Sequence, residues 1–290
     1  MRKKIIFVGL GRMGYPMAGF LSKTFSLYVY NRSKEKTEKW LSEYQGQALT
    51  SLQAVPSDTF AIISCVGNDE DLQSLYLAEQ GFVAQAPKGC LLIDHTTSSA
   101  NIAQTVNQAA AEKELLWLDA PVSGGEQGAV NGQLSIMCGG SVDAFEKSKS
   151  ILSLYAKSFS HLGDAGAGQL TKMANQIAVA GVIEGLAEAL HFAEQAGLDG
   201  SKVVKAISQG AAQSWQMDNR AETMLKSAYN HGFAVDLMRK DLGICLNEAR
   251  RLKATLPVTA IIDQFYADIQ NLGGSKWDTS SLLMRYKNKG

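Results

Sequence analysis

The stretch IIFVGLGRMGYPM, residues 5–17, decides the fold of the first half of the chain. Its first four residues are apolar and typical of a buried strand, and Gly9, Gly11 and Gly14 follow in the spacing G-x-G-x-x-G. The residues after Gly14 have helical spacing, so the order is strand, glycine turn and helix. In this order the first glycine permits a tight turn, the second lets the backbone approach a pyrophosphate, and the third lets the helix pack closely on the strand. The stretch predicts a dinucleotide-binding turn, with a plain glycine turn between two core elements as the alternative.

The composition narrows the class of protein. The chain has 290 residues, enough for two domains of about 150 residues each. Its 28 Lys and Arg balance 28 Asp and Glu, so no net positive charge favours nucleic acid. No run reaches the roughly 18 uncharged apolar residues of a membrane span, and the N-terminus shows no signal-peptide cleavage pattern. We expect a cytoplasmic protein that binds neither nucleic acid nor membrane.

The cysteines and histidines are scattered along the chain. There are four of each, with no CxxC pair and no HxxxH spacing. We therefore expect reduced core cysteines and no bound metal.

Short apolar runs alternate with amphipathic stretches through the first half of the chain. Amphipathic stretches at 34–44 and 100–114 separate several of the runs. After the opening strand, the runs that predict strands are residues 28–31, 60–66, 90–96, 115–121 and 134–140, with a further strand near 157–161. This alternation predicts a parallel sheet with helices on both faces. We expect an α/β protein in which a Rossmann-type doubly wound sheet, residues 1–163, precedes an all-helical domain, residues 164–290.

The second half begins with a long helical stretch, residues 166–197, which contains no proline and ends at Gly197. It is apolar over most of its circumference, which indicates burial in a bundle or against a second subunit. We expect a homodimer or homotetramer. The following residues are also helical in pattern, and Pro257 fits the first turn of a new helix. The long helix starts at the predicted domain boundary, so we expect its first turns to face an active-site cleft.

Asn31, Arg32 and Ser33 follow the second predicted strand, where an acidic residue would bind the ribose hydroxyls of NAD. A guanidinium and a hydroxyl can instead bind a 2′-phosphate, and Lys34 and Lys36 add positive charge nearby. The position favours NADP and leaves NAD open. The alternative is that Arg32 is a solvated residue in a turn.

Ser123, Gly124 and Gly125 follow a predicted strand and the acidic residue Asp119. Ligands of open α/β sheets bind at the carboxyl ends of strands. A serine followed by two glycines presents a hydroxyl and accessible N–H groups, which suit a carboxylate. The alternative is an ordinary turn.

Lys172 is conspicuous in the apolar stretch LTKMANQIAVAG, residues 170–181. Gly168, Lys172 and Asn175 share one helical face, with Gln176 beside Asn175. Desolvation would lower the pKa of the lysine from about 10.4 and make it a usable proton donor and acceptor. Either amide could orient the lysine or a substrate hydroxyl. The alternatives are a lysine whose ammonium reaches water and amides that bond neighbouring backbone.

Five segments carry a resemblance when they are taken together. They are GLGRMGYPMA (9–18), DHTTSS (94–99), DAPVSGGEQGAVNGQLSIMCGG (119–140), GQLTKMANQ (168–176) and FAVDLMRKDL (233–242). In this order they resemble the successive motifs of the β-hydroxyacid dehydrogenase family, which includes 3-hydroxyisobutyrate dehydrogenase, tartronate semialdehyde reductase and the glyoxylate and succinic semialdehyde reductases. The resemblance covers essentially the whole chain.

The resemblance implies roles for single residues. Lys172 matches the catalytic lysine of the family. Relatives carry an asparagine three or four residues later, so Asn175 or Gln176 orients the substrate. The turn at 123–125 matches the loop that binds the substrate carboxylate, and Thr97 falls beside the substrate. The residues implied to bind the cofactor are Gly9, Leu10, Gly11, Arg12, Met13, Gly14, Asn31, Arg32, Ser33, Val66, Gly67, Thr96 and Lys240.

One segment departs from the family. Many relatives end the third strand with a leucine-proline pair on the adenosine side of the cofactor, whereas this chain reads Cys65-Val66-Gly67. The family implies hydride transfer between a nicotinamide cofactor and a small 3-hydroxy acid or its semialdehyde. The alternatives are an NADPH-dependent reductase of small semialdehydes or imines, and a non-catalytic nucleotide-binding protein.

Overall fold

The computed structural model describes residues 2–287, which form two compact units divided between Lys172 and Met173. The division falls inside the long helix α8 (Ala167–Gln195), a few residues beyond the boundary predicted at 163. Met1 and residues 288–290, the outer ends of the two predicted domains, lie outside the described residues.

The first unit is built on a sheet of nine strands in the order β3-β2-β1-β4-β5-β6-β8-β7, with β9 paired to β8. The strands are β1 (Lys4–Val8), β2 (Ser26–Tyr30), β3 (Gln47–Ala48), β4 (Thr59–Ser64), β5 (Leu91–Asp94), β6 (Leu116–Asp119), β7 (Val122–Ser123), β8 (Leu134–Gly140) and β9 (Ala156–His161). All neighbours from β3 to β6 are parallel. The strand order reverses between β1 and β4, which is the position where doubly wound sheets bind dinucleotides.

The prediction of a parallel sheet is wrong for β8, which runs antiparallel to both β6 and β7. Only the short helix α6 (Gly125–Val130) separates β7 from β8. This connection is too short to cross a face of the sheet and return as a parallel strand, which takes about a dozen residues or more. The strand predicted near 157–161 is confirmed as β9, which is parallel to β8.

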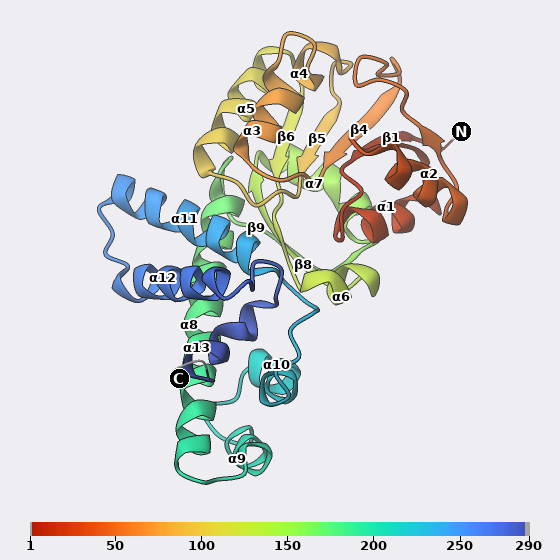
Figure 1. Cartoon of the computed structure of the whole chain (residues 1–290). Helices are drawn as coiled ribbons and strands as arrows, with labels where there is room; N and C mark the ends of the chain where they lie inside the picture. Colours follow the sequence, from red (N-terminus) through yellow and green to blue (C-terminus); the bar gives the residue numbers. More distant parts are fainter. Residues whose placement is uncertain (1, 288–290) are drawn as a thin grey trace. The chain divides into compact units, whose positions relative to one another are not determined.

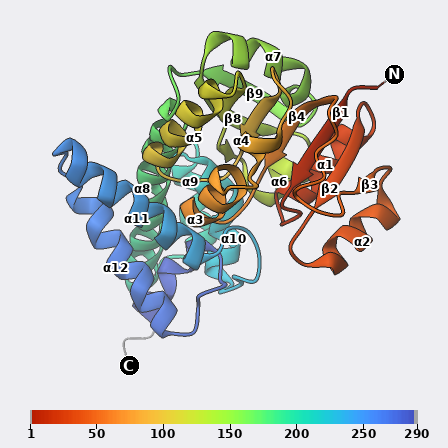
Figure 2. The same cartoon turned by 90° about the horizontal axis from the view of Figure 1, so that it is seen from above.

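Side chains of β1 alternate between two hydrophobic cores. Ile5 and Phe7 pack into one core, and Ile6 and Val8 pack into the other. The first core is completed by α1 (Gly14–Ser22), α2 (Lys34–Glu43) and α7 (Val142–Leu152). The second is completed by α3 (Asp69–Leu72), the π-helical turn η1 (Gln73–Leu77), α4 (Phe82–Gln85) and α5 (Ala100–Glu112), and the helices on both faces can be followed in Figures 1 and 2.

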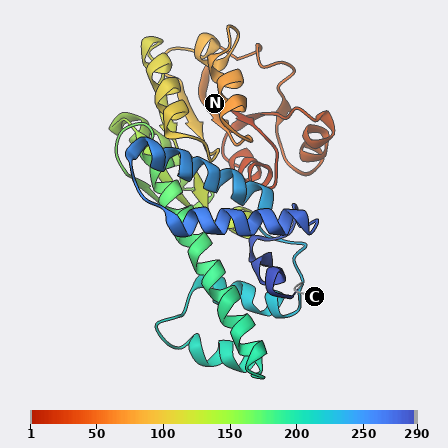
Figure 3. The same ribbon diagram turned by 60° about the vertical axis from the view of Figure 1, so that its left-hand side comes forward.

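The regular elements of the second unit are all helices over its described residues, apart from an isolated bridge between Ala234 and Asp278. Pro257 is the first residue of its helix, as predicted. Helices α11 and α12 pack side by side (Figure 3). The elements are the main part of α8, then α9 (Gly200–Ile207), α10 (Trp215–Leu225), α11 (Val235–Leu252), α12 (Pro257–Asn271), the 3-10 helix η2 (Thr279–Leu283) and α13 (Met284–Lys287).

By length and composition alone, α8 could cross a membrane, and 44% of its most apolar window is buried within the protein. Core helices of soluble proteins pass the same test. The exposed part of α8 includes Val182 and Phe192, which are 42% and 72% exposed.

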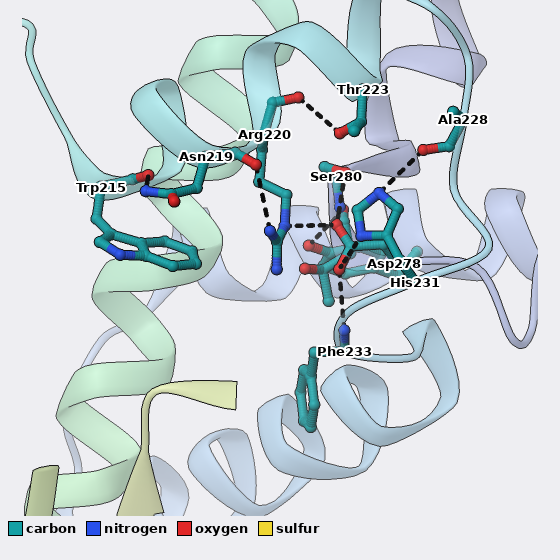
Figure 4. A network of polar contacts seen from close by, with 11 residues as sticks. Trp215, Asn219, Arg220, Thr223, Ala228, His231, Phe233, Asp278 and Ser280 are labelled. Carbon is teal, nitrogen blue, oxygen red and sulfur yellow. Dashed lines mark hydrogen bonds and ion pairs between the residues drawn. The ribbon is translucent and has the colours of Figure 1, made fainter. Parts of the chain in front are cut away.

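A fully buried carboxylate, Asp278, organises the segment that leads into α11 (Figure 4). It accepts hydrogen bonds from the Phe233 N–H at 2.9 Å and from the Ser280 hydroxyl at 2.6 Å. Arg220 of α10 forms an ion pair with it at 3.0 Å, and His231 approaches to 3.9 Å. Asp278 therefore joins α10, η2 and residues 231–233.

Candidate active site

The glycine turn after β1 is closely packed on one side and open on the other. Gly9 has φ +96°, and a Cβ there would lie 2.2 Å from the Cys65 carbonyl oxygen. A Cβ on Gly14 would lie 1.9 Å from the Gly9 oxygen, so the start of α1 rests on the turn. A Cβ on Gly11 would meet no atom within 4 Å. The turn thus leaves open space beside its middle glycine, where a phosphate can approach the backbone.

Asn31 fastens this turn to the end of β2. Its side-chain oxygen accepts the Leu10 N–H at 3.0 Å, and its amide donates to the Ser33 carbonyl at 3.2 Å. Leu10 is buried, whereas Ser33 is exposed at the N-cap position of α2. Asn31 therefore positions the glycine turn.

Two further residues predicted to bind the cofactor, Arg12 and Met13, directly precede α1. Met13 is half-buried and packs against the first core. Arg12 is exposed and lies 3.7 Å from Glu126 of α6 in an ion pair.

Arg32 lies at the carboxyl edge, but it has an acidic neighbour that the sequence analysis did not single out. Its guanidinium lies 3.0 Å from Asp71 of α3, and its side chain is 81% exposed. The other oxygen of Asp71 accepts the Gly67 N–H at 3.0 Å. A Cβ on Gly67 would lie 2.7 Å from this carboxylate, and a proline would lack the N–H. The departure from the family at Gly67 therefore makes room for Asp71. The acidic run at 69–71 is the feature of the sequence that indicates an acidic neighbour for Arg32.

The ends of β4 and β5 are joined through Thr96. Its hydroxyl accepts the Val66 N–H at 3.0 Å and donates to Asp94 at 2.7 Å. The Ser64 hydroxyl donates to the same Asp94 oxygen at 2.6 Å. Burial raises the pKa of Asp94 to about 7, against the lowering effect of these hydrogen bonds. Thr97 follows as a half-buried residue of the same turn.

The turn at 123–125 also lies beyond the carboxyl ends of the parallel strands. Ser123 ends β7 and is half-buried, and Gly124 and Gly125 are exposed. Both glycines have positive φ, +128° and +63°, a conformation that other residues rarely adopt. The structure thus brings the residues predicted after β1, β4, β5 and β6 to one edge of the sheet.

The start of α8 is attached to this edge by Asp119. Its two carboxylate oxygens accept the N–H groups of Gly166 and Gln169, at 2.7 and 3.0 Å. Burial raises the pKa of Asp119 to about 6, although these N–H groups favour the charged form. Lys172 follows within the next helical turn and is 7% exposed. The predicted catalytic lysine is therefore a buried group on a firmly attached helix.

Polar residues of the second unit form a chain of contacts. The Asn175 amide donates to the Gln176 oxygen at 2.8 Å, and the Gln176 amide donates to Asp241 of α11 at 2.7 Å. Lys240 lies 3.3 Å from Asp241. Asp241 is only 2% exposed, so the neighbours Lys240 and Asp241 are not a surface charge pair. No local feature of the sequence indicates that Asp241 is buried.

Among residues 2–287, no group of three or more His, Cys, Asp or Glu side chains is arranged to hold a metal ion. Three of the four cysteines, Cys90, Cys138 and Cys245, are buried.

Both halves of the chain match models of known protein families. Residues 4–163 match the family model described as the NAD binding domain of 6-phosphogluconate dehydrogenase. Residues 166–286 match the model described as NAD-binding of NADP-dependent 3-hydroxyisobutyrate dehydrogenase.

Relatives named for an enzymatic activity match this chain over nearly their whole length. The chain is 35% identical to 2-hydroxy-3-oxopropionate reductase of Escherichia coli, over 97% of this chain and 96% of that protein. It is 32% identical to 3-hydroxyisobutyrate dehydrogenase of Pseudomonas aeruginosa, over 98% and 99%. The structure of Mycobacterium tuberculosis 3-hydroxyisobutyrate dehydrogenase with L-serine matches with a TM-score of 0.89 and 26% identity, over 98% and 99%. The chain belongs to the β-hydroxyacid dehydrogenase family of NAD(P)-dependent oxidoreductases.

Proposed function

We propose that the protein transfers a hydride between NADP and a small 3-hydroxy acid or its semialdehyde, as a 3-hydroxyisobutyrate dehydrogenase does. The observation that carries this proposal is the buried Lys172 on a helix whose first turn is bonded to the carboxyl edge of the sheet. A buried amine near a reacting carbonyl is suited to proton transfer. A non-catalytic nucleotide-binding protein has no need of such a group.

The glycine turn fits a dinucleotide. The open space beside Gly11 and the close packing of Gly9 and Gly14 are what a pyrophosphate at a helix N-terminus requires. When bound, the nicotinamide cofactor supplies or accepts the hydride. The residues at the ends of β4 and β5 are suited to hold its nicotinamide half, and Arg32 is suited to hold a 2′-phosphate.

Each protein group then has a simple task. Lys172 donates a proton to the carbonyl oxygen in reduction and accepts the hydroxyl proton in oxidation. The turn at 123–125 binds the carboxylate and so fixes the distance from the reacting carbon to the lysine. Both ends of the Gln176 amide are engaged, with Asn175 and Asp241. We therefore assign the orientation of the substrate to Asn175.

The substrate class has support from relatives. The P. aeruginosa relative is named for 3-hydroxyisobutyrate, and the M. tuberculosis structure contains L-serine. Both compounds carry a hydroxyl on the β-carbon, C3, counted from the carboxyl carbon as C1. The E. coli relative is named as a reductase of 2-hydroxy-3-oxopropionate, which favours reduction of a semialdehyde as the second candidate direction. Reduction of an imine gives an amine and no alkoxide, so that reaction would offer no oxygen for Lys172 to protonate.

A panel of 3-hydroxy acids and semialdehydes, assayed with NAD(H) and NADP(H), tests this function. With the best substrate, Lys172→Ala should lower kcat by about 10²–10⁴ because proton transfer is lost. Its cofactor affinity should stay near that of the wild type, and Lys113→Ala, at an exposed position, should have normal kcat. Absence of turnover with every compound would contradict the substrate class. A near-normal kcat in Lys172→Ala would remove the lysine from the chemistry.

A further inference from the structure

Gln169 is a completely buried amide with both ends bonded to one stretch of backbone. Its side-chain N–H donates to the Thr96 carbonyl oxygen at 2.8 Å, and its side-chain oxygen accepts the Ser98 N–H at 3.0 Å. The amide therefore pairs with the turn after β5 much as a neighbouring strand would. Removing it leaves two buried backbone groups without these partners.

The backbone of the same residue is held by a second strand. The Gln169 N–H donates to Asp119 at the end of β6, as described above. Gly168 makes this approach to Asp119 possible, because a Cβ there would lie 2.7 Å from the Asp119 carbonyl oxygen. The first turn of α8 is thus bonded through Gln169 to the turn after β5 and through Asp119 to β6.

Gln169 and Lys172 are three residues apart on α8 and project from neighbouring positions on one side of the helix. A rotation or slide of this first turn would move Lys172 with it. The other end of the Gln169 contact is the Thr96–Ser98 turn, which includes Thr96, predicted to bind the cofactor, and Thr97, predicted to lie beside the substrate. The amide therefore links the helical turn that leads to Lys172 with the part of the sheet edge assigned to the reacting end of the cofactor.

We propose that Gln169 is a positioning residue, which fixes Lys172 relative to the Thr96–Ser98 turn so that proton and hydride transfer occur in one geometry. The proposal rests on the function proposed above. Displacement of a reacting group by about 1 Å can lower a rate by about 10²-fold. Loss of Gln169 should therefore lower kcat and leave the affinity for cofactor nearly unchanged.

Gln169→Met removes both side-chain hydrogen bonds and keeps the length of the side chain. We expect its kcat to fall by about 10–100-fold with less than about a threefold change in the nucleotide dissociation constant, measured by fluorescence titration. Amide hydrogen exchange should rise at residues 96–98 and 166–170. Gln85→Met is the matched control, because Gln85 also bonds backbone carbonyls but lies in α4. This control should behave like the wild type.

Gln169→Glu tests the direction of the hydrogen bond to Thr96. A protonated carboxyl can donate to the Thr96 carbonyl and accept from Ser98, whereas a carboxylate can only accept. The ratio of its kcat to that of the wild type should fall as pH rises. Burial raises the pKa values of Asp94 and Asp119 nearby, and both residues are present in both proteins, so the comparison with the wild type accounts for their own pH dependence. This variant keeps the test open if Gln169→Met does not fold.

The outcomes separate this proposal from the proposed function. If Lys172→Ala is inactive while Gln169→Met has a kcat within about twofold of the wild type, Gln169 has no positioning role. A Gln169→Glu activity ratio that is constant with pH would also overturn the proposal. If Lys172→Ala keeps its kcat, the proposed function itself fails, whatever Gln169→Met shows.

Discussion

Arg32 has two candidate partners for its guanidinium, the observed Asp71 and the expected 2′-phosphate of NADP. The ion pair with Asp71 involves a largely exposed arginine, and such pairs contribute about 0–1 kcal/mol. A charge-assisted bond to a phosphate contributes about 1.5–3 kcal/mol. The phosphate contact is the stronger of the two, so NADP should remain favoured, by up to about two powers of ten.

Two substitutions test this balance. Arg32→Asp should reverse the preference, because an acid there accepts ribose hydroxyls and repels the phosphate. Asp71→Asn should increase the preference for NADP, because it removes a negative charge and releases Arg32. The measurement is kcat/KM with both nucleotides. Equal use of NAD and NADP by the wild type, or no response to either change, would show that Arg32 takes no part in cofactor choice.

From the sequence, a position at the sheet edge can be predicted for residues that belong to a glycine pattern or that follow the end of a strand. Thr96 is an example, because an apolar run that stops marks where a strand ends. Asp119, Gln169 and Asp241 could not be identified as buried polar groups, since nothing local distinguishes a buried polar side chain from an exposed one. Gln169 finds its side-chain partners more than 70 positions away.

Among the elements, the strands that the sequence predicts best are β1, β2, β4, β5, β6 and β8, because each is a short and mostly apolar run. The predicted ends were too long at 95–96 and 120–121, since residues beyond β5 and β6 are buried as well. The two-residue strands β3 and β7 carry too few side chains to form a pattern. The reversed direction of β8 was missed because an apolar run has the same appearance in either direction.

The segment entering α11 depends on Asp278, so removal of this carboxylate should destabilise the second unit. Asp278→Ala leaves Arg220, whose side chain is 18% exposed, and the Phe233 N–H without their partner. Breaking a buried ion pair from one side costs about 3–5 kcal/mol. Denaturant unfolding should show a loss of about this size.

Asp268→Ala is the control for Asp278. Its ion pair with Arg285 at 2.9 Å involves a carboxylate that is 54% exposed. Its loss should cost less than about 1 kcal/mol. Equal effects of the two substitutions would mean that Asp278 does not hold the segment in place.

For the whole molecule, we propose self-association through α8. The helix leaves Val182 and Phe192 exposed in a largely apolar sequence, a surface that a second copy would cover. Light scattering at micromolar concentration should give a mass of two or four chains. Phe192→Glu should lower this mass, whereas Leu252→Glu, at an exposed position on α11, should not. A monomeric mass for the wild type would contradict the proposal.

The division of the side chains of β1 between two cores also constrains how this sequence can change in length. A one-residue insertion or deletion inside β1 would exchange the two sets of side chains between the faces of the sheet. It would also move Gly9 away from the position where only glycine fits beside the Cys65 carbonyl. Residues 53–58, outside any strand or helix, carry neither restriction. Insertions and deletions can therefore accumulate in such loops during evolution, while the spacing from Lys4 to Gly14 admits substitutions only.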